Sequence, residues 1–193
     1  AQPHIYLVTP PSLELEGFVS LLSNILDTVE IACVRLALAD EDEDALLRAG
    51  DALREVAHAR DVPLVISKHV GMVERLGLDG VHLTDGARSV RKTRSTLGAD
   101  AIVGAFCEAS THDGMTAGEA GADYIAFGPV GETGLGSDTR AERDLFAWWS
   151  QMIELPVVAE GALTAELVAD LAPVTDFFAI GAEIWRMDDP KQA

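Results

Sequence analysis

Basic residues are scarce in this sequence. It holds 14 Lys and Arg against 32 Asp and Glu among 193 residues, which gives a formal net charge of −18. A protein that binds the phosphate backbone of a nucleic acid needs a basic face, so we expect no nucleic-acid partner. The excess of acids is typical of a solvated, self-repelling surface that keeps a protein in solution.

Cysteine and long apolar runs are also scarce. The two cysteines, Cys33 and Cys107, lie in apolar, strand-like runs and are expected to be buried thiols, not a disulfide framework. No apolar run approaches the roughly 18 residues that span a bilayer. The first residues, AQPHIYLVTPP, lack the basic and apolar regions of a signal peptide. We therefore expect no membrane association and a cytoplasmic location.

Short apolar runs alternate with amphipathic helical patterns along the chain, and 48% of the residues are hydrophobic. Strands that alternate with helices predict a parallel sheet, and continuous apolar character indicates that both of its faces are covered. Strands are expected at 4–9, 31–38, 63–67, 80–84, 101–106, 124–128, 156–161 and 176–181. Helices are expected at 15–28, 42–60, 72–76, 88–98, 115–121, 141–154, 164–172 and 182–187.

Eight strand–helix units predict an α/β fold, a closed single-domain (β/α)8 TIM barrel over residues 1–193. A doubly wound open sheet is the alternative, although no G-x-G-x-x-G follows the first strand. Two local features can be tested. The acidic segment 39–45 is expected to open a helix, or otherwise to hold a cation. In the helix expected at 141–154, the residues with core spacing are Leu145, Trp148, Trp149 and Met152.

In a parallel barrel, functional residues gather where the strands end. Arg35 and His82 lie within two of the predicted strands. A buried guanidinium needs an acid or an anion beside it, so Arg35 is expected to contact either a carboxylate or a ligand. His82 is either a satisfied core histidine or a catalytic group. The glycine-rich loop 131–136 has no Lys or Arg, and its backbone N–H groups could approach an anion.

Three segments occur together in a familiar order: LGLDGVHLTD (76–85), GADYIAFGPV (121–130) and LPVVAEGALT (155–164). They resemble the family of thiamine phosphate synthases and thiazole tautomerases (TenI), which are small TIM barrels. The resemblance runs from about residue 5 to residue 186. It implies synthesis of thiamine phosphate, a transferase reaction of thiamine biosynthesis, from a pyrimidine pyrophosphate and a thiazole phosphate with Mg²⁺ on the pyrophosphate.

Most residues that the family uses for Mg²⁺ and pyrophosphate are replaced. Lys68 and Ala87 stand at two metal-ligand positions, and an ammonium repels a cation. Asp85 could supply a shifted ligand, and Thr133 is the surviving match to the pyrophosphate loop. We therefore expect no metal cofactor. Pro129 stands where the tautomerase has a His, so that chemistry is not implied.

The resemblance also implies a phosphate site between the last two strands, formed by backbone N–H groups of Gly161, Ala162, Gly181 and Ala182. The expected substrate pocket comprises Arg35, Ser67, Asp85, Phe106, Gly128, Pro129 and Thr133. Lys68, His82 and Glu160 are the candidate catalytic residues, and Arg35, Lys68 and Glu160 are expected to form one charge-balanced cluster.

Three functions stay open at this point. The first is a thiamine phosphate synthase-like barrel that binds a small phosphorylated molecule. The second is a different, proton-transferring enzyme on the same barrel, with Glu160 or His82 as base and Lys68 stabilising an oxyanion. The third is a non-catalytic ligand-binding barrel. In each case the partner is a small molecule, and a homo-oligomer is possible.

Overall fold

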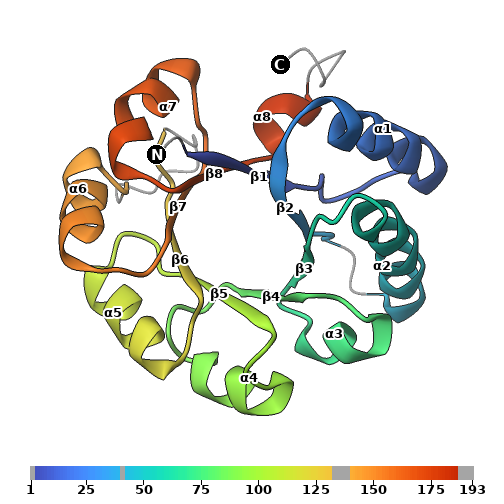
Figure 1. Cartoon of the computed structure of the whole chain (residues 1–193), viewed down its shortest axis with the longest axis horizontal. Helices are drawn as coiled ribbons and strands as arrows, with labels where there is room; N and C mark the ends of the chain where they lie inside the picture. Colours follow the sequence, from blue (N-terminus) through green and yellow to red (C-terminus); the bar gives the residue numbers. More distant parts are fainter. Residues whose placement is uncertain (1–2, 40–41, 132–139, 187–193) are drawn as a thin grey trace.

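A computed structural model describes residues 3–39, 42–131 and 140–186. Its eight parallel strands close into a barrel in the order β1-β2-β3-β4-β5-β6-β7-β8 (Figure 1). The strands are β1 His4–Val8, β2 Ile31–Leu36, β3 Leu64–Ser67, β4 Gly80–Leu83, β5 Ile102–Phe106, β6 Tyr124–Phe127, β7 Val157–Glu160 and β8 Phe177–Ile180. The predicted barrel is confirmed, and the open-sheet alternative is wrong because β1 pairs with both β2 and β8.

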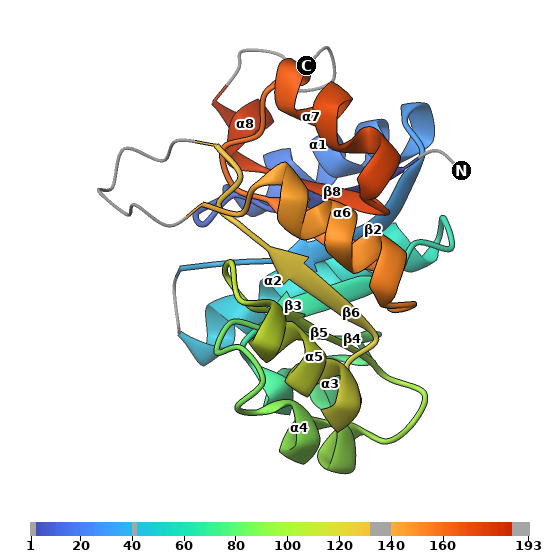
Figure 2. The same cartoon turned by 90° about the vertical axis from the view of Figure 1, so that its left-hand side faces the viewer.

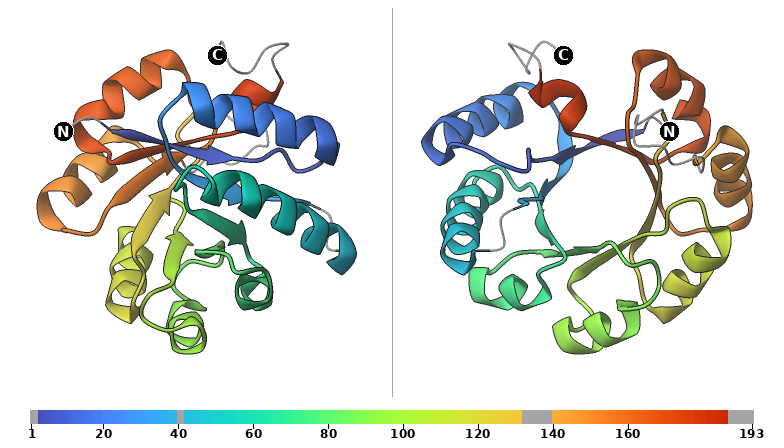
Figure 3. Two further views of the ribbon diagram at one scale, coloured as in Figure 1. Left: turned by 45° about the vertical axis from the view of Figure 1, so that its right-hand side comes forward. Right: turned by 180° about the vertical axis from the view of Figure 1, so that it is seen from behind.

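A helix follows each strand and covers the outside of the barrel, as the two further views show (Figure 3). In the side view, α5, α6 and α7 are stacked along one flank (Figure 2). The helices are α1 Leu15–Thr28, α2 Glu43–His58, α3 Val70–Leu76, α4 Val90–Leu97, α5 Thr111–Ala120, α6 Arg143–Met152, α7 Ala165–Leu171 and α8 Ala182–Trp185, with a 3-10 turn at Ala172–Val174. In the described part of the chain, none of these helices has both the length and the apolarity that a membrane span requires.

Helix boundaries follow local capping chemistry. The acidic segment does open a helix: the carboxylate of Asp42 accepts a hydrogen bond from the N–H of Ala45 at the start of α2. Thr164 caps α7 in the same way, through the N–H of Leu167. Gly121 ends α5 with a left-handed φ of 117°, which glycine adopts without a steric penalty. These contacts set the first turns of α2 and α7 and the last turn of α5.

The core has two parts. The larger part lies between the strands and the surrounding helices and includes the buried faces of α1, α2 and α6. The smaller part fills the inside of the barrel with alternate strand residues, namely Tyr6, Cys33, Val65, Tyr124, Ala126, Val158 and Ala179. Gly104 makes room in this interior, because a Cβ there would lie 2.0 Å from the ring of Tyr124.

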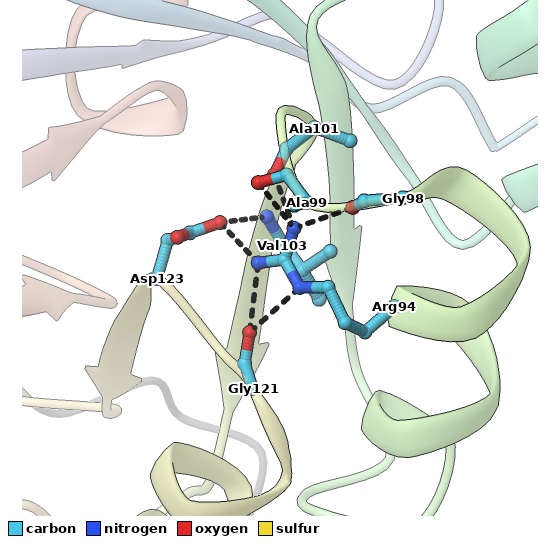
Figure 4. Close-up of polar contacts among 7 residues, drawn as sticks. All are labelled: Arg94, Gly98, Ala99, Ala101, Val103, Gly121 and Asp123. Atoms are coloured by element: carbon cyan, nitrogen blue, oxygen red, sulfur yellow. Dashed lines mark hydrogen bonds and ion pairs between the residues drawn. The ribbon is translucent and has the colours of Figure 1, made fainter.

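Three aspartates tie neighbouring strands together where strands begin. Asp79, Asp123 and Asp176 each stand one residue before a strand, and each carboxylate accepts the backbone N–H of Leu64, Val103 or Val157 respectively. Asp123 also pairs with Arg94 of α4, whose guanidinium donates to the carbonyls of Gly121, Gly98, Ala99 and Ala101 (Figure 4). These contacts lie at the end of the barrel opposite the strand carboxyl termini, the end whose polar groups serve stability and not catalysis.

The prediction of which residues of α6 face the core is partly wrong. Trp149 is fully buried, but Trp148 is 39% exposed and Met152 is 64% exposed. The buried partner is Phe146, which packs with Trp149 around the ring of Phe127. Residues three apart share a helix face, and in this helix the pair 146 and 149 faces the barrel.

Candidate functional site

Unusual backbone conformations gather where the strands end. Lys68, Glu108 and Ala162 have left-handed φ angles of 70°, 53° and 53°, and they follow β3, β5 and β7. Non-glycine residues adopt this conformation at a cost, and such residues concentrate at functional sites. The strand carboxyl ends are also the end of the barrel where active sites form, so the candidate site lies there.

A bidentate ion pair between β2 and β7 lies near this end of the barrel. The Nη1 and Nη2 atoms of Arg35 on β2 donate to Oε1 and Oε2 of Glu160 on β7, at 3.3 and 3.0 Å. Burial lowers the pKa of Arg35, but several neighbouring groups, with the Glu160 carboxylate first among them, together hold that pKa above its usual value. The guanidinium also lies over the ring of Tyr6, 5.5 Å from its centroid. The expected carboxylate partner of Arg35 is therefore Glu160.

A chain of polar contacts, two of them hydrogen bonds, leads from this pair into the barrel. His82 on β4 has Nε2 at 3.6 Å from Oε1 of Glu160, and its Nδ1 lies 2.6 Å from the hydroxyl of Tyr124. The Tyr124 hydroxyl in turn lies 2.5 Å from that of Tyr6. The sequence patterns did not reveal the two tyrosines as polar partners. The signal was present, since each occupies an inward position of an otherwise apolar strand.

Burial decides the charge of these groups. It lowers the pKa of His82 well below the ordinary value, with Arg35 as the second cause. It raises the pKa of both tyrosines above the ordinary value. At neutral pH the imidazole and the phenols are therefore neutral, and Arg35 and Glu160 carry the charges. The side chain of Glu160 is 19% exposed, against 8% for Arg35 and 2% for His82, so Glu160 is the member most accessible to a ligand.

Lys68 adjoins this network through its backbone, since its N–H donates to the carbonyl of His82 at 3.0 Å. With Asp85 it lines a cavity of about 400 Å³ between the ends of β3 and β4 and the helix α4. Its side chain makes no ion pair with Glu160 among the described residues. The structure thus joins the side chains of His82, Glu160 and Arg35, and the convergence of Lys68 with His82 and Glu160 stays a prediction.

The residues beside Lys68 do not fit a Mg²⁺ ion. Mg²⁺ prefers carboxylate and other oxygen ligands in an octahedral arrangement, whereas this cavity places two ammonium groups, on Lys68 and Lys92, near the single carboxylate of Asp85. That carboxylate also accepts a 2.5 Å hydrogen bond from the hydroxyl of Ser89. Within residues 3–39, 42–131 and 140–186, no three His, Cys, Asp or Glu side chains cluster as metal ligands would.

The start of the glycine-rich loop is held against the end of β7. The N–H groups of Val130 and Gly131 both donate to the carbonyl of Gly161, at 3.1 and 3.0 Å. A Cβ on Gly128 would lie 2.2 Å from the carbonyl oxygen of Glu160, so only glycine fits this close approach. These N–H groups are occupied and are not available to an anion. Thr133 lies outside the described residues.

The ends of β7 and β8 present two backbone donors to one point. The N–H of Leu163, after β7, and the N–H of Gly181, after β8, donate to Oε2 and Oε1 of Glu183 at 3.0 and 2.9 Å. Gly161, Ala162 and Ala182 belong to the same two turns. Sequence reasoning placed a phosphate here but missed the carboxylate. The signal was an acid two residues after the final strand's glycine, in the segment IGAE.

The remaining pocket residues also follow strand ends. Ser67 is the last residue of β3 and Phe106 the last of β5, and both are half-buried. Pro129 is half-buried next to the turn after β7, where its Cα would lie 2.7 Å from a Cβ on Gly161. Cys107 follows Phe106 but is buried, which raises the pKa of its thiol to about 12, and Cys33 inside the barrel behaves alike. Neither thiol is an activated nucleophile.

Similarity to known proteins identifies the family. The family model described as thiamine monophosphate synthase matches residues 5–184. The chain belongs to this family. A thiamine-phosphate synthase of Rhodospirillum centenum is 40% identical over 184 residues, covering 94% of this chain and 89% of the relative. Another, from Erythrobacter litoralis, is 32% identical over 191 residues, covering 96% of this chain and 89% of the relative.

Solved structures agree with this family at the level of the fold. A thiamine phosphate pyrophosphorylase from Pyrococcus furiosus superposes with a TM-score of 0.85 at 18% identity, over 98% of this chain and 91% of that chain. The resemblance stated from the three sequence segments is therefore confirmed, and the protein is a TIM-barrel member of the thiamine monophosphate synthase family.

Proposed function

We propose that this barrel binds a small phosphorylated molecule at the ends of β7 and β8 and that its reaction is thiamine phosphate synthesis from a pyrimidine pyrophosphate and a thiazole phosphate. The observation that carries the proposal is the pair of backbone N–H groups, Leu163 and Gly181, that converge on one anion from two strand ends. Backbone donors at this end of a TIM barrel are a recurrent phosphate site. The synthases named among the relatives support the activity.

The barrel's own side chains supply position and charge balance. Arg35 holds the carboxylate of Glu160 with both terminal nitrogens, which fixes that carboxylate in one orientation at the mouth. The Nε of Arg35 is buried and donates to none of the described residues. A buried donor without a partner costs about 1–3 kcal/mol, so this atom supports the presence of a polar ligand atom beside the pair. We propose that Glu160 orients the substrate and that His82 and the tyrosines keep the pair rigid.

The cation requirement is proposed to differ from that of the family. Because Lys68 stands where the family has a metal carboxylate, we propose that the protein alone binds Mg²⁺ weakly. We also propose that the protein acts in the cytoplasm. Assembly into a homo-oligomer stays a prediction.

The test is a turnover assay with the pyrimidine pyrophosphate and the thiazole phosphate, with and without added Mg²⁺. Formation of thiamine phosphate, reduced at least about tenfold in Glu160→Gln, is the expected result, since one charge-assisted contact is worth about that much. Glu166→Gln on the exposed start of α7 is the control and should retain activity. No thiamine phosphate in any condition would contradict the proposed reaction.

A further inference from the structure

The carboxylate of Glu183 fills the place where a phosphate is proposed to bind. Its two oxygens take the N–H groups of Leu163 and Gly181, one each, from the turns after β7 and β8. Both donor residues are buried, whereas the side chain of Glu183 is half-buried. A carboxylate presents two oxygens to two donors much as a phosphate does, so the chain supplies its own anion to this site.

We propose that Glu183 determines which ligands enter at the ends of β7 and β8. While its carboxylate occupies these two donors, an anionic group cannot use either N–H and must displace the carboxylate to reach them. This inference rests on the proposed phosphate site, and it adds that the site is closed by a residue of this chain.

The charges near the site strengthen the competition. Glu160 stands three residues before Leu163, and its carboxylate already holds Arg35. An incoming phosphate therefore meets the Glu183 carboxylate, which has its own sign, and finds both terminal nitrogens of Arg35 already held by Glu160. A neutral group can lie beside Glu183 without moving it. Phosphorylated ligands should accordingly bind weakly to the native protein and more tightly once Glu183 is neutral.

A purely structural role is the rival explanation. Glu183 is the second residue of α8, and an acid there can bond back to the N–H of the capping residue, Gly181. That explanation does not account for the second bond, which reaches Leu163 on a different turn. It also makes a different prediction: loss of a cap lowers thermal stability but leaves phosphate affinity unchanged.

The experiment measures the affinity for inorganic phosphate by isothermal titration in the native protein, Glu183→Gln and Glu183→Ala. Substitution at Gly181 is unsuitable, because a Cβ there would lie 2.9 Å from the carbonyl oxygen of Val8. Glu183→Gln keeps the shape and removes the charge. We expect phosphate to bind about tenfold more tightly to both variants, the affinity equivalent of one charge-assisted hydrogen bond. Glu166→Gln, an acid at the start of α7, should change affinity less than about twofold.

Two outcomes overturn the inference and separate it from the proposed function. Equal, measurable affinity in the native protein and the Glu183 variants would show that Glu183 does not compete, while the phosphate site itself would stand. Binding by none of them would overturn both. Should the variants not fold, amide NMR of the native protein decides: saturating phosphate is expected to shift the Leu163 and Gly181 signals, and unmoved signals contradict the displacement.

Discussion

At the scale of single residues, Ala162 holds a strained backbone conformation beside the proposed site. Its φ is 53°, in the left-handed region, where an L side chain costs roughly 1–2 kcal/mol. Glycine removes that cost but loses about 0.5–1 kcal/mol through the greater freedom of the unfolded chain. Ala162→Gly should therefore raise the free energy of unfolding, by about 0.5 kcal/mol. Denaturant titration measures it. Ala52→Gly, inside α2, is the control and should destabilise, and a loss in both variants would contradict the strain.

His82 makes the stability depend on pH. Its pKa in the folded protein lies well below the value near 6.5 of the unfolded chain. The unfolded state therefore binds the proton first, and the contribution to stability is fully present above about pH 6.5 and is lost as the pH falls below it. His82→Gln should flatten the fall in unfolding free energy between about pH 6.5 and 5, by up to about 1.4 kcal/mol per pH unit.

The matched control for that titration is His112→Gln on α5, whose side chain is exposed. Its pH profile should follow the native protein. If the unfolding free energy of the native protein and of His82→Gln fell with the same slope as the pH is lowered, burial would not hold His82 neutral. The assignment of neutral side chains to His82 and the two tyrosines would then be wrong.

At the scale of elements, the three aspartates that precede β4, β6 and β8 stabilise the pairing of neighbouring strands through hydrogen bonds to backbone N–H groups. Asp123 accepts the N–H of Val103 at 2.8 Å and pairs with Arg94 (Figure 4). Asp123→Ala leaves the Val103 N–H without its acceptor, and we expect a loss of about 1–2 kcal/mol in unfolding free energy. Thermal or denaturant unfolding measures it. Asp100→Ala replaces an exposed acid before β5 and should change the free energy of unfolding little. An equally small loss in both variants would contradict a stabilising role for the contacts of Asp123 with Val103 and Arg94.

Local periodicity was enough to predict the elements but not the contacts between them. The eight strands and their helices appear where alternating apolar runs placed them, because strand and helix periods are local properties. Local spacing misplaced Trp148 and Met152, since which face of α6 turns inward is settled by packing against Phe127. It also placed the start of α5 at Met115, whereas the cap of Ser110 begins that helix at Thr111.

The contacts of the candidate site could likewise be predicted only in part from the sequence. A buried guanidinium demands an acid, so the pairing of Arg35 with Glu160 could be anticipated from the sequence. Lys68 follows β3 as expected, but the left-handed turn there accompanies a separate cavity with Asp85. The contact of Glu183 with Leu163 joins two turns 20 residues apart, and no local pattern reports such a distance. The roles of Lys68, Ser67, Phe106 and Pro129 stay predictions.

At the scale of the whole molecule, a strongly acidic barrel binds an anion only where backbone N–H groups or paired cations offset its charge of −18. Among the residues that the structure describes, two places meet that requirement. One is the end of β7 and β8, with the N–H groups of Leu163 and Gly181. The other is the cavity of Lys68 and Lys92 beside Asp85. We assign the phosphate to the first, because its donors already hold an anion in a fixed geometry.

A crystal structure of the protein grown with the thiazole phosphate tests this assignment most directly. We expect phosphate density within hydrogen-bond distance of the Leu163 and Gly181 nitrogens, with the side chain of Glu183 turned away and the Arg35–Glu160 pair intact. Phosphate bound between Lys68 and Lys92, with Glu183 still on its two backbone donors, would contradict it.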